Sequence, residues 1–266
     1  MLSTTTILPP PPPARTASRQ ELIDTIQRIA AVQSMKAVID ITLTVQTDAR
    51  DRETLYPDVR GALVIRRPGW IRTNAQSPGG IAKVYDMVSD GKRFRVHLPF
   101  RNRVYEGKTS LTRMSQNRAE NIRPQHLLEA VMIEPITDTA NVVLDIERYG
   151  QSGYQVLHLL ERGEDGLFRI RRKYWFSRSD LELSRLMILD ERTEVATDAW
   201  YRDWLEDNGL PYPQHMRVER PQDGYSLEIE ILKPGLNEEI PDASFQLSLP
   251  DSIEVEQVGD GGAENS

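Results

Sequence analysis

The side chains that most often carry catalysis are scarce in this sequence. The chain has no cysteine and only four histidines, His97, His126, His158 and His215, among 266 residues. Without cysteine there is no disulfide, no thiolate nucleophile and no cysteine-based zinc site. The histidines are widely separated, and no Gly-x-Ser-x-Gly nucleophile motif is present. The 40 aspartates and glutamates are plentiful, but nothing in their spacing marks one pair as a general acid and base.

Two short patterns resemble known sites but lack the rest of the motif. Gly107-Lys108-Thr109 is similar to the end of a phosphate-binding loop, yet Asn102 stands where that loop needs a glycine. His126 and Glu129 have the i, i+3 spacing of di-metal bundles, but no second such pair is present. We therefore expect no catalytic residue, no metal site and no cofactor, and we predict that the protein is not an enzyme.

Charge and alternation argue against nucleic acid as the partner. The formal net charge is −7, whereas binding to phosphates needs a concentrated basic surface. The run of residues 168–176 mixes basic and aromatic side chains, but a strand explains most of it: the basic residues alternate with the apolar ones. One face would carry Arg169, Arg171 and Lys173, and the other Phe168, Ile170, Tyr174 and Phe176, with Arg172 as an exception on the apolar face.

The elements that must position any site begin with a helix. Ser18 and Glu21 form a capping box, in which each side chain can satisfy a backbone N–H of the first turn. Leu22, Ile26 and Ile29 follow at helical spacing and predict an amphipathic helix to about Ser34. A second, short helix is predicted from Arg123-Pro124 to Met132, because proline is favoured in the first turn.

Between and after these helices, apolar residues alternate with polar ones from Lys36 onward, which is typical of half-buried strands. Turns rich in glycine, serine and aspartate separate the strands, as at residues 77–80 and 222–224. Many short strands without βαβ spacing indicate a mainly β, α+β fold, a sandwich or a barrel. The alternating sets are Ile39, Ile41, Leu43, Val45; Leu63, Ile65; Phe94, Val96, Leu98; Val142, Leu144, Ile146; Leu181, Leu183, Met187, Leu189; and Tyr225, Leu227, Ile229, Ile231.

The two ends of the sequence differ from the rest in composition. We predict a disordered, proline-rich leader over residues 1–17, one domain over 18–255, and a flexible acidic tail over 256–266. Two interpretations of the start remain open: a cytosolic protein with a disordered N-terminus, or an exported chain whose signal has been removed. No apolar run approaches the ~18–20 residues that span a bilayer.

Three segments, in order, resemble the outer-membrane lipoprotein carrier and receptor superfamily. They are Gly61 to Pro68 (Gly-Ala-Leu-Val-Ile-Arg-Arg-Pro), Met87 to Lys92 (Met-Val-Ser-Asp-Gly-Lys) followed by a strand and Leu98-Pro99-Phe100, and Ile240 to Pro250. The resemblance covers residues 18–255. The chain departs from the family by extra sequence around 161–215, whose role is left open and which suggests an uncharacterised lipoprotein branch.

The resemblance implies a strongly curved antiparallel half-barrel, with the N-terminal helix and short lid helices over its concave face. It implies binding or transport of lipid or lipoprotein acyl chains in the bacterial periplasm or outer membrane, with a chaperone-like carrier role and an N-terminal lipid anchor outside this sequence. Two alternatives stay open: an envelope sensor or interaction domain that binds a partner protein, and a structural lipoprotein without a ligand. The predicted cavity-facing residues are Leu43, Leu63, Ile65, Phe94, Val96 and Leu127.

Arg67 is the most informative single residue. It shares strand parity with Leu63 and Ile65, so its side chain should point to the apolar interior, where a guanidinium must find acceptors. By resemblance, Arg67 is the lid latch that bonds backbone carbonyls of the lid helices. The alternative is that the strand ends at Pro68 and Arg67 bends to solvent.

Overall fold

The computed structural model describes residues 14–46, 52–77, 80, 82–109, 122–149, 152–247, 249 and 253–258. Among these residues the elements, in chain order, are α1 (Arg19–Ala30), β1 (Ser34–Gln46), β2 (Arg52–Arg66), β3 (Trp70–Gln76), β4 (Lys83–Asp90), β5 (Arg93–Leu98), the 3-10 helix η1 (Pro99–Arg101), β6 (Arg103–Lys108), α2 (Pro124–Val131), the 3-10 helix η3 (Thr139–Asn141), β7 (Val142–Tyr149), β8 (Ser152–Arg162), β9 (Phe168–Ser177), β10 (Leu183–Leu189), β11 (Val195–Asp207), β12 (Leu210–Arg220), β13 (Tyr225–Leu236), the 3-10 helix η4 (Asp242–Phe245) and β14 (Glu254–Val258).

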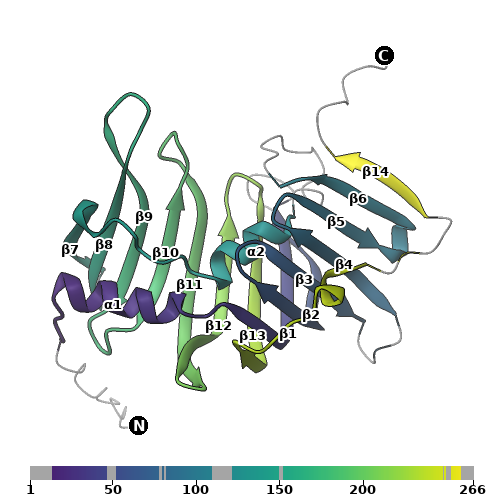
Figure 1. Ribbon diagram of the computed structural model, residues 1–266, viewed down its shortest axis with the longest axis horizontal. Coiled ribbons are helices and arrows are strands. Elements are labelled where there is room, and N and C mark those ends of the chain that lie inside the picture. Colours follow the sequence, from purple (N-terminus) through teal and green to yellow (C-terminus); the bar gives the residue numbers. More distant parts are fainter. Residues whose placement is uncertain are drawn as a thin grey trace, which may run out of the picture.

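The strands form one open, curved sheet with β1 near its middle (Figure 1). Their order is β14-β6-β5-β4-β3-β2-β1-β13-β12-β11-β10-β9-β8-β7. Every described neighbour pair is antiparallel except β14 with β6, and the end strands β14 and β7 do not pair with each other, so the sheet is not a closed barrel. The predicted class, a mainly β half-barrel, is confirmed. The alternation on β1 explains its central place, since every second side chain from Ala37 to Val45 is buried.

The curvature has local causes in the strands. Register shifts interrupt the pairing of β1 with both neighbours, at Val38/Ile39 with β13 and around Leu43 with β2. Such bulges bend a strand and increase its twist. Gly61 on β2 allows a further close approach, because a Cβ there would lie 2.0 Å from the Asn74 carbonyl oxygen on β3. This accounts physically for the glycine that opens the first of the family-like segments.

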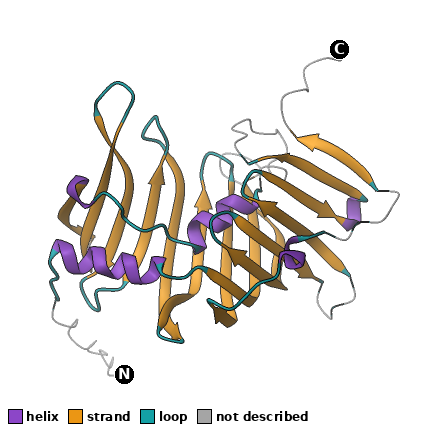
Figure 2. Ribbon diagram, in the orientation of Figure 1, coloured by secondary structure: helices purple, strands orange, loops and turns teal. Residues whose placement is uncertain are grey.

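Both α-helices lie on the same face of the sheet (Figure 2). The capping box predicted for α1 is present: the Ser18 side chain accepts from the Glu21 N–H, and the Glu21 carboxylate accepts from the Ser18 N–H. The buried stripe of α1, with Leu22, Ile23 and Ile26 almost fully enclosed, belongs to the main core with the inward side chains of the strands. Helix α2 contacts β3 and β4 on one side and β11 on the other, so it bridges the two halves of the sheet.

The predicted end of the first helix was wrong by four residues. Helix α1 ends at Ala30, and Ser34 already begins β1. The side chain of Asn237 accepts hydrogen bonds from the Gln33 and Ser34 N–H groups, at 2.6 and 3.2 Å. These contacts with the segment after β13 draw the chain into the sheet and stop the helix.

The additional sequence around 161–215 extends the sheet. It supplies the end of β8 and all of β9, β10 and β11, together with half of β12. Leu181, expected in a strand, lies instead in the turn before β10 with a φ of 70°. On β9, Tyr174 and Phe176 are buried as predicted, but Phe168 is 54 % exposed because a bulge opposite Leu159/Leu160 breaks the alternation.

The edges of the predicted domain also need correction. Residues 15–17 were assigned to the leader, yet the Arg15 N–H donates to the Arg178 carbonyl, and Ala17 exchanges two hydrogen bonds with the buried Gln155 side chain. At the other end, β14 runs to Val258, three residues into the predicted tail. The rest of both predicted segments lies outside the described residues. No described helix combines the length and apolar character needed to cross a bilayer.

Candidate functional site

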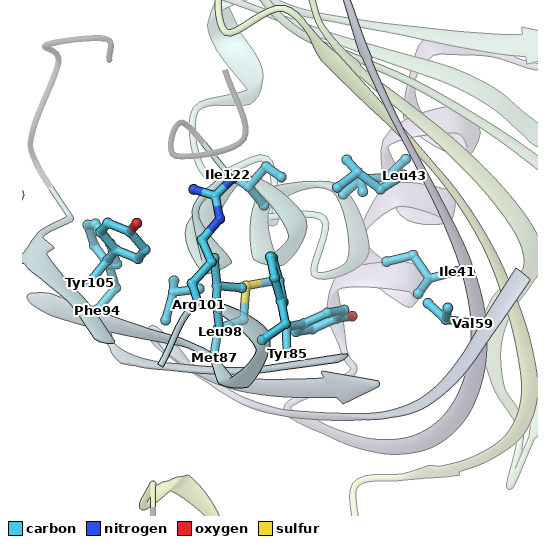
Figure 3. Close-up of a pocket in the computed structure, with 13 residues that line it drawn as sticks. Ile41, Leu43, Val59, Tyr85, Met87, Phe94, Leu98, Arg101, Tyr105 and Ile122 are labelled. Atoms are coloured by element: carbon cyan, nitrogen blue, oxygen red, sulfur yellow. The ribbon is translucent and has the colours of Figure 1, made fainter. Parts of the chain in front are cut away.

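An apolar cavity of about 330 Å³ lies on the concave side of the half formed by β1 to β6 (Figure 3). Its walls come mainly from the inward side chains of β1, β2, β4, β5 and β6, because alternation directs these apolar residues to one face. The lining residues are Ile41, Leu43, Val59, Tyr85, Met87, Phe94, Val96, Leu98, Phe100, Arg101, Tyr105, Ile122 and Leu227.

The polar groups of this cavity are few. The hydroxyl of Tyr85 lies 3.3 Å from that of Thr73, so the two form a hydrogen bond within the wall. Arg101 is the only charged side chain among the 13 described residues that line the cavity. A surface of this kind can hold an apolar group but offers no described nucleophile or acid–base pair next to it.

The predicted cavity residues divide into two groups. Leu43, Phe94 and Val96 line the cavity. Leu63, Ile65 and Leu127 do not, since each is fully enclosed in the main core, where the helices cover the sheet. Strand parity identifies the face on which a residue lies, but only the position of α1 and α2 decides which part of that face stays open.

Several lining residues were not predicted. Ile41 and Leu227 belong to alternating sets that the sequence shows, so parity could have identified them. Tyr85 and Met87 lie two residues apart on β4 and so share a face, but every residue from Tyr85 to Ser89 is buried, so alternation does not single them out. Phe100 and Arg101 lie in η1, a 3-10 turn for which no periodic signal exists.

Next to the cavity, α2 and the five residues after it form a strap across the concave face. We call residues 124–136 the lid segment. Three side chains from different elements donate hydrogen bonds to its carbonyl oxygens at intervals of three residues. The Tyr201 hydroxyl of β11 bonds the Ala130 carbonyl at 2.8 Å, Arg67 Nη2 bonds Ile133 at 2.8 Å, and Gln27 Nε2 of α1 bonds Ile136 at 2.7 Å. Because Ala130, Ile133 and Ile136 are buried, these donors satisfy carbonyls that water cannot reach.

Arg67 makes the most connections of the three donors. Besides Ile133, its Nε bonds the Val32 carbonyl at 3.0 Å, just after α1, and its backbone N–H bonds the Gln33 carbonyl. The side chain of Arg67 therefore points inward, as its strand parity predicts, and does not bend to solvent. Burial lowers the pKa of Arg67, and the nearby Glu134 opposes that shift. Glu134 also forms an ion pair with Arg172, the basic residue expected on the apolar face of β9.

A buried polar cluster holds the other end of the lid segment. His126 Nδ1 lies 2.6 Å from the Tyr225 hydroxyl and 3.7 Å from the Asp223 carboxylate, which Arg220 engages at 2.8 Å. Burial, reinforced by the positive charges of Arg220 and Arg123, holds the pKa of His126 well below its usual value. His126 is therefore neutral near pH 7, and its role here is to dock α2 against the β12–β13 turn.

One further group of possible metal ligands lies on β7 and β8, away from the cavity. Ligand atoms of Asp145, Glu147 and His158 lie within 4.8 Å of one another. However, Glu147 already accepts a hydrogen bond from the Trp175 indole at 2.9 Å, and the charge of Lys173 helps to lower the pKa of His158, after burial. A neighbouring cation disfavours a bound metal ion, so we assign no metal to this group.

No protein-family model matches the sequence, and no curated protein matches it. Solved structures do resemble it. A DUF1329 family protein from Desulfovibrio piger superposes with a TM-score of 0.52 and 13 % identity, over 86 % of this chain and 95 % of that one. A LolA superfamily protein from Nitrosomonas europaea gives a TM-score of 0.49 and 13 % identity, over 87 % and 99 %. A domain from Vibrio parahaemolyticus, described as outer membrane lipoprotein-sorting, gives 0.46 and 10 %, over 86 % and 97 %. The first of these superpositions shows that this chain shares its fold with the DUF1329 family protein over most of both chains.

Proposed function

We propose that this protein binds acyl chains of lipids or lipoproteins in the cavity on its concave face and carries them, without catalysis, in the bacterial cell envelope. The observation that supports this most strongly is the cavity itself: about 330 Å³, with a single charged residue among its described lining. Pockets for small ligands measure ~300–1,000 Å³, so this cavity suits one flexible apolar chain.

The energetics favour an acyl chain as the occupant. Each buried methylene contributes ~0.8 kcal/mol, so eight methylenes would contribute ~6 kcal/mol before the cost of ordering the chain. Met87, with its flexible thioether, gives the wall a side chain that can adapt to such a ligand. A periplasmic or outer-membrane location is part of this proposal, since a carrier of acyl chains is needed where they must cross an aqueous space.

In this proposal the lid segment controls the cavity, and Arg67 is its latch. Its guanidinium ties the carbonyl that follows α1 to the carbonyl that follows α2. Helix α2 packs against β3 and β4, which lie in the half of the sheet that holds the cavity. No described residue of the lid segment lines the cavity itself, but movement of this segment would open the concave face beside the cavity and so admit a longer chain.

Native mass spectrometry of protein purified from bacterial cells tests the proposal. We expect adducts with the masses of lipids on the wild type. Val96→Trp, which fills the cavity from β5, should remove most of the adduct, whereas Val143→Trp at an exposed position of β7 should retain it. Absence of lipid from the wild type, together with no binding of an added fluorescent fatty acid, would overturn the proposal.

The alternative from the sequence, an interaction domain that recognises an envelope protein, predicts a different result. In that case the Val96→Trp variant would retain its protein partner in a pull-down, and the wild type would bind no acyl chain. A structural lipoprotein would bind neither.

A further inference from the structure

We propose that the ligand is an amphiphile with an anionic headgroup, which Arg101 binds at the mouth of the cavity while the acyl chain lies inside. This inference rests on the proposed function and adds the chemical class of the ligand. Carboxylate and phosphate headgroups share the chemistry in question, a compact anion attached to an apolar chain.

The turn between β5 and β6 places Arg101 at the rim. Pro99 begins η1, and Asn102 ends it in the left-handed conformation, with a φ of 50°. The three-residue turn thus directs two consecutive side chains, Phe100 and Arg101, to the cavity lining. Phe100 is 62 % exposed, and so this part of the lining marks where the cavity meets solvent.

The side chains at this rim are arranged for an amphiphile. The Arg101 guanidinium carbon lies 5.5 Å from the centre of the Phe100 ring, so a cation and an exposed aromatic surface stand together. Figure 3 shows Arg101 extending from the wall that carries Leu98 and Met87 toward the side that Ile122 lines. The methylenes nearest a headgroup could contact Phe100, while the rest of the chain passes to the apolar walls.

The other described arginines of this hairpin lie outside the cavity. Arg93 and Arg95 form ion pairs with Glu106, at 2.7 and 2.8 Å, and Arg103 pairs with Glu256 at 2.9 Å. None of these three lines the cavity. Among the described arginines of this hairpin, Arg101 alone lines the cavity.

A guanidinium at an apolar rim selects for anions. Its planar N–H groups match the geometry of a carboxylate or phosphate and can donate two parallel hydrogen bonds. The attraction is stronger beside apolar walls than in open water. A neutral headgroup gains no electrostatic attraction to the guanidinium. Ligands with the same acyl chain should therefore differ in affinity according to the charge of the headgroup.

Displacement of a fluorescent, uncharged acyl probe from the intact chain tests the inference. The competitors are dodecanoate and dodecanol, which share one chain length, then lysophosphatidylglycerol and lysophosphatidylcholine with one shared acyl chain, and inorganic phosphate alone. For the wild type we expect each anionic amphiphile to bind about tenfold more tightly than its neutral or zwitterionic counterpart, as one charge-assisted contact provides. Inorganic phosphate should displace nothing.

The variants separate this inference from the proposed function. Arg101→Gln should lower the affinity for dodecanoate about tenfold and leave that for dodecanol unchanged. Arg95→Gln removes the same charge from the same hairpin outside the cavity, and should change neither. Equal affinity of the wild type for both competitors, or equal losses for both in Arg101→Gln, would overturn the headgroup inference while the proposed function stands. Failure of the wild type to bind any acyl chain would overturn both.

Discussion

Replacing Arg67 by leucine should loosen the lid segment while the rest of the fold persists. The variant loses two hydrogen bonds from a charged donor, to the Val32 and Ile133 carbonyls. A hydrogen bond that involves a charged group contributes ~1.5–3 kcal/mol, and a buried acceptor left without a donor costs ~1–3 kcal/mol. Leucine returns part of this loss by apolar packing. We therefore expect the closed lid to be destabilised by ~2–4 kcal/mol, which corresponds to ~30- to 1,000-fold more opening.

Hydrogen exchange followed by mass spectrometry measures this opening directly. Amides of the lid segment, residues 124–136, should lose protection by that factor in Arg67→Leu, while the central strands keep theirs. Exchange of bound lipid should accelerate in parallel. The matched control is Arg66→Leu. This neighbouring arginine also makes two hydrogen bonds, but to the Ile240 carbonyl and the Asp242 carboxylate.

The two variants distinguish a latch at Arg67 from general destabilisation of the fold. If Arg67→Leu leaves lid exchange and lipid exchange as in the wild type, Arg67 is not a latch. If Arg66→Leu accelerates lid exchange as much as Arg67→Leu, the effect comes from general destabilisation. If Arg67→Leu unfolds, Arg67→Lys, which keeps the charge but not the two-armed geometry, should fold and show an intermediate rate.

Three further predictions concern the contacts around the lid and the first helix. Tyr201→Phe removes the hydroxyl that bonds the Ala130 carbonyl and should lower the free energy of unfolding by ~1–3 kcal/mol, measured by urea denaturation; an unchanged midpoint would show that this bond is dispensable. His126 has a folded-state pKa below its unfolded value of 6.5, so the unfolded state binds the proton more readily. Stability should therefore be complete above pH 6.5 and fall as the pH decreases, by at most ~1.4 kcal/mol per pH unit; His126→Gln should lose this slope, and an identical slope would contradict the assignment. Ser18→Ala removes the capping box of α1 and should cost ~0.5–2 kcal/mol; a smaller loss than for Thr25→Ala, within the same helix, would contradict the capping argument.

The sequence could predict the faces of the strands, because alternation has a period of two that side-chain type reveals directly. The capping box of α1, the proline at the start of α2 and the inward direction of Arg67 follow from equally local rules, and the structure confirms them. Local rules cannot predict where two segments that are distant in the sequence meet in the fold. The end of α1 depends on Asn237, some 200 positions away, which receives the Gln33 N–H.

The same limit explains the mixed outcome for the cavity. Leu63 and Leu43 look alike in the sequence, since both are inward-facing leucines on neighbouring strands. Both belong to the buried core, but Leu43 also lines the cavity and Leu63 does not, and only the placement of the helices distinguishes them. Bulges add a second limit. The bulge on β9 exposes Phe168, because one extra residue reverses the direction of every side chain beyond it.

Photo-crosslinking would show whether an acyl chain occupies the concave cavity. A fatty acid with a diazirine near its terminal methyl group is bound to the intact protein and irradiated, and the modified peptides are identified by mass spectrometry. We expect adducts on cavity residues such as Leu43, Met87 and Val96, and the loss of these adducts in Val96→Trp. Adducts concentrated instead on exposed apolar residues outside the cavity, such as Leu167 and Phe168 in the β8–β9 hairpin, would contradict it.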